Sequence, residues 1–223
     1  MRLKPSFWSR MAEAYDEWFR RGEGPTVYRE EASAILRLAG KLKPGRLLDV
    51  GCGTGIFSEV FRRMGWEIVG LDYSPGMLSK AKEKGFTVIL ADAGRLPFKT
   101  ESFDGAFMFT VLEFLQKPLT ALREVSRVVK PHGSLILGVH NLWNPWNLYR
   151  KFRALFKASS AYRHIEYYTL GRLKGLLREA SFTLEEASTV LFHPKTVRVE
   201  RFLGVSGFGR FGVLLIARAV RED

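Results

Sequence analysis

The most restrictive feature of this chain is the nine-residue string LLDVGCGTG at positions 47–55. Its first half has the character of a buried strand, and three alternating glycines then lead into an apolar helical pattern that begins at Ile56. Glycines let a backbone turn sharply and lie against a ligand, and the N-terminus of the following helix favours polar groups. The carboxylate of Asp49 would repel a pyrophosphate but can hold an ammonium group. The string therefore predicts a ligand-binding loop between a strand and a helix.

The glycine spacing argues against a dinucleotide site. A dinucleotide fingerprint reads G-x-G-x-x-G. Counted from Gly51, its third glycine would fall at Ile56. An NAD-dependent oxidoreductase is therefore an alternative function, but both the glycine spacing and Asp49 argue against it.

Length and composition predict one ordinary globular domain. The chain has 223 residues, of which 46% are hydrophobic and 26% charged, which suits a single α/β domain. No apolar run approaches the ~20 residues of a membrane-spanning helix, and the N-terminus has no apolar core of the signal-peptide type. We therefore expect a cytoplasmic protein without stable membrane insertion.

Charge and cysteine content limit the classes of function. The net charge of +12 is compatible with RNA, an anionic membrane surface, an acidic substrate or solubility alone. Cys52 is the single cysteine, so a disulfide framework and a cysteine-rich zinc site are excluded. We interpret Cys52 as a small residue that fits between two glycines.

Strands and helices alternate along the chain. Two helices, at 6–21 and 28–42, precede strands expected at 46–50, 67–71, 86–91, 103–110 and 134–139, with helices at 56–64, 75–84 and 118–129. A turn at Pro131-His132-Gly133 introduces the fifth strand, and a helix at 170–180 precedes a closing antiparallel hairpin of 183–192 and 211–220. This alternation predicts a doubly wound, mostly parallel sheet with helices on both faces, and a ligand at the carboxyl ends of the strands.

Two further acids end the next strands of this pattern. Asp72 ends the second strand, where a carboxylate can accept hydrogen bonds from both ribose hydroxyls, and Tyr73 beside it can pack on an adenine ring. Asp92 ends the third strand within the sequence ADA at 91–93. Asp72 thus favours an adenosine-type cofactor, a requirement that NAD enzymes share.

In this order the segments resemble the Rossmann-like (class I) S-adenosylmethionine-dependent methyltransferases, in a small-molecule subgroup similar to enzymes of ubiquinone biosynthesis. The resemblance covers residues 10–185 in outline and is specific over 46–137, through LLDVGCGTG, LDYS, ADA, LPFKTESFDGAF and RVVKPHGSLIL. It implies a seven-stranded sheet of order 3-2-1-4-5-7-6, with strand 7 antiparallel; the helical cap insertion that we expect at 141–168 is a departure from the minimal family pattern. The resemblance also implies S-adenosylmethionine as cofactor, S-adenosylhomocysteine as product and no metal.

The sequence contains no repeats and no low-complexity linkers, so we expect a single domain, 1–223, in four segments. These are an N-terminal helical lid (1–43), a cofactor-binding core (44–140), a substrate-side insertion (141–168), and a final helix with an antiparallel hairpin (169–223).

The same resemblance assigns the cofactor-binding residues. Asp49 would help to hold the methionine ammonium, with Gly51, Cys52 and Gly53 along the methionine portion. Asp72 would bind the ribose, and the remaining positions would surround the adenine, the methyl group or the lid: Tyr73, Asp92, Ala93, Thr110, Val111, Tyr15 and Tyr28. Asp104 is expected to be structural.

His140, at the end of the fifth strand, is our candidate general base. Methyl transfer needs the acceptor in line behind the methyl group at ~3–3.5 Å, and a base where the acceptor is protonated at neutral pH. A hydrogen-bonded structural role for His140 remains an equal alternative.

The segment NLWNPWNLYRKFRALFK at 141–157 interleaves aromatic and basic residues at helical spacing. We expect a cap helix whose aromatic face covers the site and whose basic face is solvated. A membrane-surface helix for a lipid-like substrate and a basic-aromatic surface for RNA are the alternatives.

These features favour methyl transfer to a small molecule. Thr110-Val111-Leu112-Glu113 follows the fourth strand, in place of the Asn/Asp-Pro-Pro-aromatic motif that grips planar amino groups. An RNA (tRNA or rRNA) methyltransferase and a non-catalytic S-adenosylmethionine-binding protein are the remaining alternatives. The acceptor and the oligomeric state have no signature in the sequence.

Overall fold

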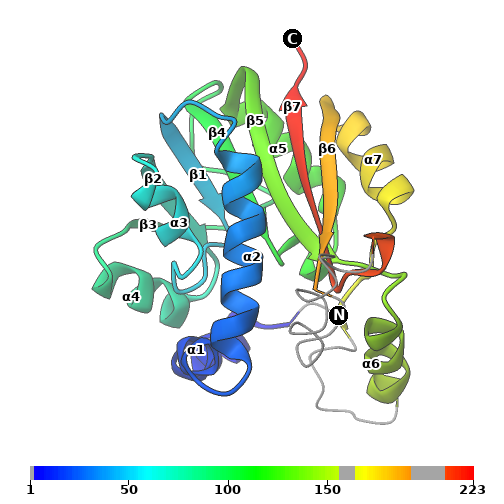
Figure 1. The fold of residues 1–223 in the computed structure, drawn as a ribbon. Coiled ribbons are helices and arrows are strands. Elements are labelled where there is room, and N and C mark those ends of the chain that lie inside the picture. The colour runs from blue at the N-terminus through cyan, green and yellow to red at the C-terminus, as the bar shows by residue number, and fades with distance from the viewer. Residues whose placement is uncertain (1–2, 156–163, 192–208) are drawn as a thin grey trace.

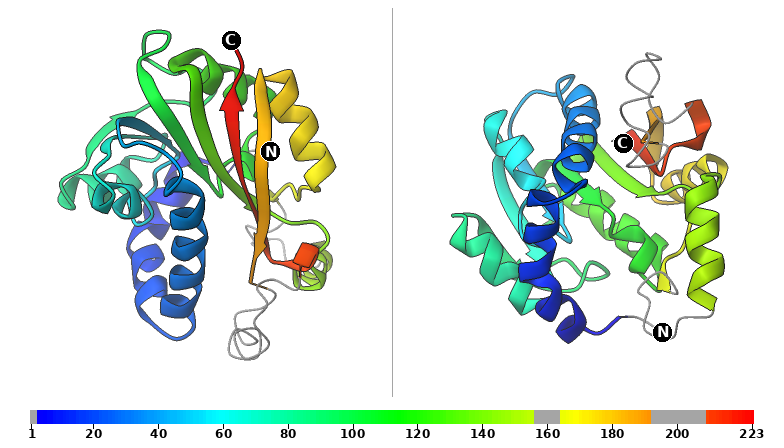
Figure 2. Two further views of the ribbon diagram at one scale, coloured as in Figure 1. Left: turned by 45° about the horizontal axis from the view of Figure 1, so that its top comes forward. Right: turned by 60° about the horizontal axis from the view of Figure 1, so that its bottom comes forward.

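The computed structural model describes residues 3–155, 164–191 and 209–223, which form a central sheet with helices on both faces (Figures 1 and 2). The strands are β1 (Arg46–Val50), β2 (Glu67–Asp72), β3 (Thr87–Leu90), β4 (Phe103–Phe109), β5 (Val129–His140), β6 (Phe182–Val190) and β7 (Leu214–Arg221). Their order is β3-β2-β1-β4-β5-β7-β6, and β7 runs antiparallel to both β5 and β6. The predicted fold class and strand order are confirmed.

In the described ranges, five helices cover the two faces of the sheet, and two more, at Pro5–Arg20 and Pro145–Leu155, lie beyond the carboxyl ends of its strands (Figure 1). The helices are α1 (Pro5–Arg20), α2 (Gly24–Ala39), α3 (Ser58–Arg63), α4 (Pro75–Glu83), α5 (Pro118–Val128), α6 (Pro145–Leu155) and α7 (Leu170–Glu179), with short 3-10 turns η1 (Leu112–Phe114) and η4 (Gly209–Phe211). Phe107 and Phe109 of β4 pack in the core that contains α2 and α3, whereas Met108 packs in the core that contains α5 and α7. β4 is apolar on both faces because it is covered on both.

Polar side chains fix the starts of two helices. Ser74 Oγ accepts a hydrogen bond from Met77 N at the start of α4, and Thr169 Oγ1 accepts one from Arg172 N at the start of α7. α3 begins two residues later than predicted, at Ser58, because the glycine loop with positive φ at Gly51, Gly53 and Gly55 precedes it.

β5 is longer than predicted. Its pairing with β4 begins at Val129 and shifts register before Ser134, and His132 has a φ of +60°. The expected turn at 131–133 is therefore a bulge inside the strand. His132 Nε2 lies 3.0 Å from an Asp223 carboxylate oxygen at this end of the sheet, away from the carboxyl ends of the parallel strands.

The predicted lid at 1–43 divides into two parts. α1 packs on α4, where Ser9 Oγ lies 3.0 Å from Ser74 Oγ, and on the glycine loop, where Thr54 Oγ1 donates to Asp16 Oδ1 at 2.5 Å. The second half of α2 instead belongs to the core, with Ile35 and Leu38 fully buried. Only α1 and the first half of α2 reach the carboxyl ends of the strands (Figure 2).

None of the helices in the described ranges is long and apolar enough to cross a membrane.

Candidate functional site

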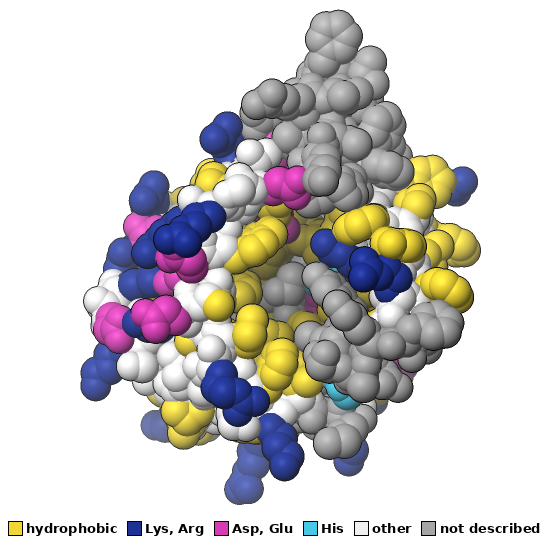
Figure 3. Space-filling model, turned by 90° about the horizontal axis from the view of Figure 1, so that it is seen from below, with side chains coloured by type: hydrophobic (Ala, Val, Ile, Leu, Met, Phe, Trp, Pro, Cys, Tyr) yellow, Lys and Arg dark blue, Asp and Glu magenta, His cyan; other side chains and the backbone are white. Residues whose placement is uncertain are grey.

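A cavity of about 630 Å³ lies at the carboxyl ends of β1, β2, β4 and β5. Viewed from this side, the molecule is hollowed, and hydrophobic side chains surround the opening (Figure 3). The wall is mainly apolar, with a small number of ionisable groups. Its place in the fold is the one predicted for the ligand, and its size is typical of small-molecule sites.

The glycine loop forms one wall of this cavity. Gly51 N and Cys52 N both donate to the Leu71 carbonyl, at 2.6 and 3.0 Å, which turns the chain across the end of β2. Gly51 has a φ of +74°, and a Cβ atom there would lie 2.3 Å from Val111 Cγ2. Glycine is therefore required at position 51 both by the backbone angle and by the close approach of Val111.

Asp49 lies buried beneath the loop. Ser58 Oγ donates to Asp49 Oδ2 at 2.5 Å, and the side chain lines the cavity. The pKa of the Asp49 carboxyl is raised to about 7, chiefly by burial and also by the neighbouring Asp72, against the lowering effect of the Ser58 hydrogen bond. A cation beside Asp49 would favour its charged form.

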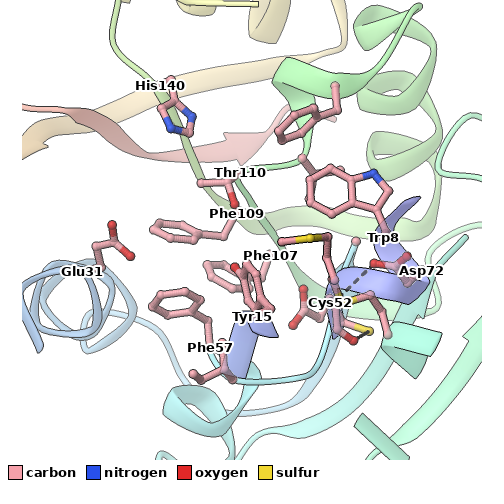
Figure 4. A pocket seen from close by; sticks show the side chains of 18 of the residues that line it. Trp8, Tyr15, Glu31, Cys52, Phe57, Asp72, Phe107, Phe109, Thr110 and His140 are labelled. Atoms are coloured by element: carbon pink, nitrogen blue, oxygen red, sulfur yellow. Dashed lines mark hydrogen bonds between the residues drawn. The ribbon is translucent and has the colours of Figure 1, made fainter. Parts of the chain in front are cut away.

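Asp72 ties the end of β2 to the loop. Gly53 N donates to Asp72 Oδ2 at 3.0 Å, and Ser74 N donates to Oδ1 at 2.8 Å (Figure 4). The carboxylate nevertheless lines the cavity, as does Tyr73, whose hydroxyl donates to the Leu3 carbonyl at 2.8 Å.

Two of the residues assigned to the cofactor lie outside the cavity wall. Asp92 is exposed, accepts a hydrogen bond from Gly94 N at 2.8 Å and lines a separate hollow, whereas its neighbour Ala93 lines the main cavity. Tyr28 packs its ring on Phe57, with centroids 5.4 Å apart, behind the wall. The structure therefore does not bring Asp92 and Tyr28 together with the other predicted residues.

Thr110 and Tyr15 meet across the cavity. Thr110 ends β4 with a φ of +54°, a conformation that is strained for a β-branched residue, and its N donates to the Gly138 carbonyl at 2.8 Å. Burial, the larger effect, raises the pKa of the Tyr15 hydroxyl, whereas the Thr110 side chain lies close enough to that hydroxyl to have a lowering effect on its pKa. This contact joins α1 to β4, beside Val111.

His140 lines the cavity from the end of β5 (Figure 4), and its ring is paired with an acid. Its Nδ1 lies 2.6 Å from Glu113 Oε1, and the Glu113 side chain is completely buried. Backbone bonds hold both residues, since Tyr168 N donates to the His140 carbonyl and Glu166 N to the Glu113 carbonyl, each at 2.9 Å. An imidazole bonded through Nδ1 to a buried carboxylate leaves Nε2 as the atom that can exchange a proton with a ligand.

Glu31 is a residue of the cavity wall that sequence patterns did not identify. It is 92% buried, and burial alone raises the pKa of its carboxyl to about 8. The sequence does carry a signal, because Glu31 lies four residues from both Val27 and Ile35, on the buried stripe of α2.

The predicted orientation of the cap helix is wrong. The side chains of Tyr149 and Phe152 on α6 are exposed, at 46% and 61%, whereas Arg150 lines the cavity from the same helix.

Three buried asparagines fix this orientation, Asn141, Asn144 and Asn147. Asn144 Nδ2 donates to the Phe211 carbonyl at 2.7 Å, and Asn147 Nδ2 donates to the Val213 carbonyl at 2.8 Å. Because these bonds satisfy buried polar groups, they hold the start of α6 so that Asn147 turns inward and Tyr149 and Phe152 turn outward.

Across the described residues, no cluster of three or more His, Cys, Asp and Glu side chains is arranged to hold a metal ion.

Comparison with known proteins agrees with this architecture. Residues 48–137 match a family model described as a methyltransferase domain. An uncharacterised protein of Methanocaldococcus jannaschii is 30% identical over 206 residues, which cover 92% of this chain and 95% of that protein.

Two further relatives carry a named activity. A crystal structure of an S-adenosylmethionine-dependent methyltransferase from Thermotoga maritima aligns with a TM-score of 0.73 and 28% identity, over 96% of this chain and 98% of that one. A demethylmenaquinone methyltransferase of Renibacterium salmoninarum is 37% identical over 105 residues, which cover 46% of this chain and 44% of that enzyme.

The raised pKa of Glu31 predicts a pH-dependent stability. The folded protein keeps the Glu31 proton up to about pH 8, whereas the unfolded chain loses it near its ordinary value of 4.5, so rising pH destabilises the wild type in this window. Glu31→Gln should therefore gain stability relative to the wild type between pH 5 and 8.5, by on the order of 4 kcal/mol. Urea denaturation at several pH values measures the difference, with Glu30→Gln as the control. A difference that stays constant with pH would contradict the buried, protonated state of Glu31.

Proposed function

This chain belongs to the Rossmann-like S-adenosylmethionine-dependent methyltransferases, and we propose that its cavity brings S-adenosylmethionine together with a small-molecule acceptor. The observation that carries the proposal is the continuity of the cavity. One wall is the glycine loop with Asp49 and Asp72, and another holds the His140–Glu113 pair.

The cofactor end of the cavity is assigned from its charges and its open backbone. Asp49 is a buried carboxylate beside the loop, and an ammonium group there would offset the cost of its charge. Gly51 and Gly53 leave the loop backbone accessible to the methionine portion. Asp72 accepts hydrogen bonds from Gly53 N and Ser74 N, and ribose hydroxyls would add to these, because a carboxylate has about four lone-pair sites.

The acceptor end follows from the His140–Glu113 pair. When bound, S-adenosylmethionine supplies a methyl group already activated by its cationic sulfur. His140 Nε2 accepts the proton that the acceptor gives up, and Glu113 holds the ring through Nδ1 and stabilises the imidazolium. Thr110 and Val111, at the end of β4, shape the wall between the two ends.

A small acceptor is favoured over RNA by the character of the cavity wall. The wall is mainly apolar and aromatic, which suits an organic molecule that is largely enclosed. The relative from Renibacterium salmoninarum, named for methylation of a demethylmenaquinone, supports the same class of acceptor. The cytoplasmic location and the oligomeric state stay outside this proposal.

Asp72→Asn should weaken binding of S-adenosylhomocysteine by about 1–3 kcal/mol, because the charge-assisted hydrogen bonds to the ribose are lost. Isothermal titration calorimetry measures this change. Asp104→Asn is the matched control, since Asp104 accepts a hydrogen bond from Arg46 N at the other end of the sheet. Equal affinity in the Asp72 variant and the wild type would remove Asp72 from the ribose site, and stabilisation by NADH instead would overturn the cofactor assignment.

His140→Ala should lower kcat by about 10²–10⁴-fold through loss of the general base, with unchanged affinity for S-adenosylhomocysteine. Glu113→Gln should give a smaller loss, since the ring remains but loses the charge that stabilises its protonated form. Release of S-adenosylhomocysteine in a screen of amines, phenols, quinols and carboxylic acids supplies the acceptor and the assay. The control is His132→Ala, an exposed histidine far from the cavity. Full turnover by the His140 variant across pH would exclude it as the base.

A further inference from the structure

We propose that Glu31 and the aromatic rings beside it form a subsite for an ammonium group of the acceptor, so that the substrate is an organic amine bound as its cation. The inference rests on the proposed function and specifies the acceptor class. Glu31 here anchors the substrate, and the methyl group goes to a nucleophile of the same molecule that His140 deprotonates.

The position of Glu31 separates it from the cofactor end. It projects from α2 into the cavity on the side opposite Asp72, and the rings of Phe57 and Phe109 lie between them (Figure 4). His140 lines the same cavity from the end of β5. A molecule anchored at Glu31 therefore enters the space that both His140 and the cofactor end border.

The surroundings of Glu31 are aromatic and apolar. Phe57 packs against Phe19 and Phe109, with ring centroids 5.5 and 4.7 Å apart, and Phe109 stacks on Phe107 at 5.7 Å. These four rings line the cavity, and so does Val27. Aromatic faces attract cations, and a neighbouring carboxylate adds a direct ion pair.

The cost of burying Glu31 is what points to a ligand. The side chain is 92% buried, and within the described ranges no hydrogen bond or ion pair to its carboxyl group is found. Burial raises its pKa to about 8, so an empty site holds the carboxyl mainly in its neutral form at pH 7. A carboxylic acid at this position binds a ligand more strongly than a neutral side chain would only when the ligand carries a positive charge. That charge favours the carboxylate form of the acid.

An organic cation fits this site better than a metal ion. The described residues provide no group of three or more His, Cys, Asp or Glu that could coordinate a metal. A single carboxylate among phenyl rings instead matches an alkylammonium, which offers N–H donors to the acid and apolar surface to the rings.

Binding of the cation has a proton balance that can be measured. An ammonium ion binds to the ionised carboxylate, so a protonated Glu31 must first release its proton to the buffer. Affinity should therefore rise between pH 6.5 and 8.5, and binding at pH 7 should release up to one proton. A role of Glu31 in folding alone would give neither effect.

The test uses the full chain saturated with S-adenosylhomocysteine and two matched probes, 2-phenylethylammonium and 2-phenylethanol. We expect the ammonium to bind at least tenfold more tightly than the alcohol in calorimetry, with proton release detected from the heats in two buffers. An alcohol that binds equally well would mean that Glu31 acts as a neutral hydrogen-bonding group, which overturns the proposal. No ammonium binding at millimolar concentration would also overturn it.

Two variants assign the selectivity to this residue. Glu31→Gln should abolish the tenfold preference and the proton release while leaving the affinities for the alcohol and for S-adenosylhomocysteine unchanged. Glu30→Gln, one residue away and outside the cavity wall, should behave as the wild type. A Glu31 variant that loses S-adenosylhomocysteine affinity and keeps the ammonium preference would assign Glu31 to the cofactor instead. Failure of the wild type to bind S-adenosylhomocysteine would contradict the proposed function itself, which separates the two hypotheses.

Discussion

The site depends on the attachment of the glycine loop to the end of β2. The Leu71 carbonyl accepts hydrogen bonds from Gly51 N and Cys52 N, and the Asp72 carboxylate accepts one from Gly53 N. Leu71 and Asp72, which are consecutive residues of β2, thus hold the glycine loop that follows β1. Because Gly51 also lies against Val111, the loop shape is fixed from both sides, and the cavity lies between these fixed points.

Local sequence patterns predicted the features that local chemistry determines. The alternation of strands and helices and the alternate glycines predicted the doubly wound sheet, the place of the cavity and the glycine loop, because each rests on the periodicity or backbone angle of a short segment. The strand order was implied by the resemblance to the methyltransferase family. Helix and strand limits shifted where tertiary contacts decide them, as at the bulge around His132. The orientation of α6 was predicted wrongly because the prediction relied on the spacing of the hydrophobic residues and not on the three asparagines. The hydrogen-bond partners of these asparagines, at 211–213, are distant in sequence.

Burial sets the electrostatic character of the cavity. Asp49 and Glu31 both have pKa values raised by desolvation, to about 7 and about 8, and they come from different elements. The sequence alone indicates that Glu31 lies on the apolar face of α2. It does not indicate that this face packs in the core along one part of the helix and lines a cavity along another. The pairing of His140 with Glu113 likewise appears only when β5 lies beside η1. The acidic groups together make the cavity suited to cationic ligands, in a chain whose net charge is +12.

The most direct test of the central claim is a crystal structure of the full chain with bound S-adenosylhomocysteine. The account predicts that the ligand occupies the cavity, with its ammonium group near Asp49 and its ribose hydroxyls within hydrogen-bond distance of Asp72. It also predicts that the sulfur faces the open space bordered by Thr110, His140 and Glu31. A ligand bound elsewhere, or one whose ribose lies away from Asp72, would contradict the account.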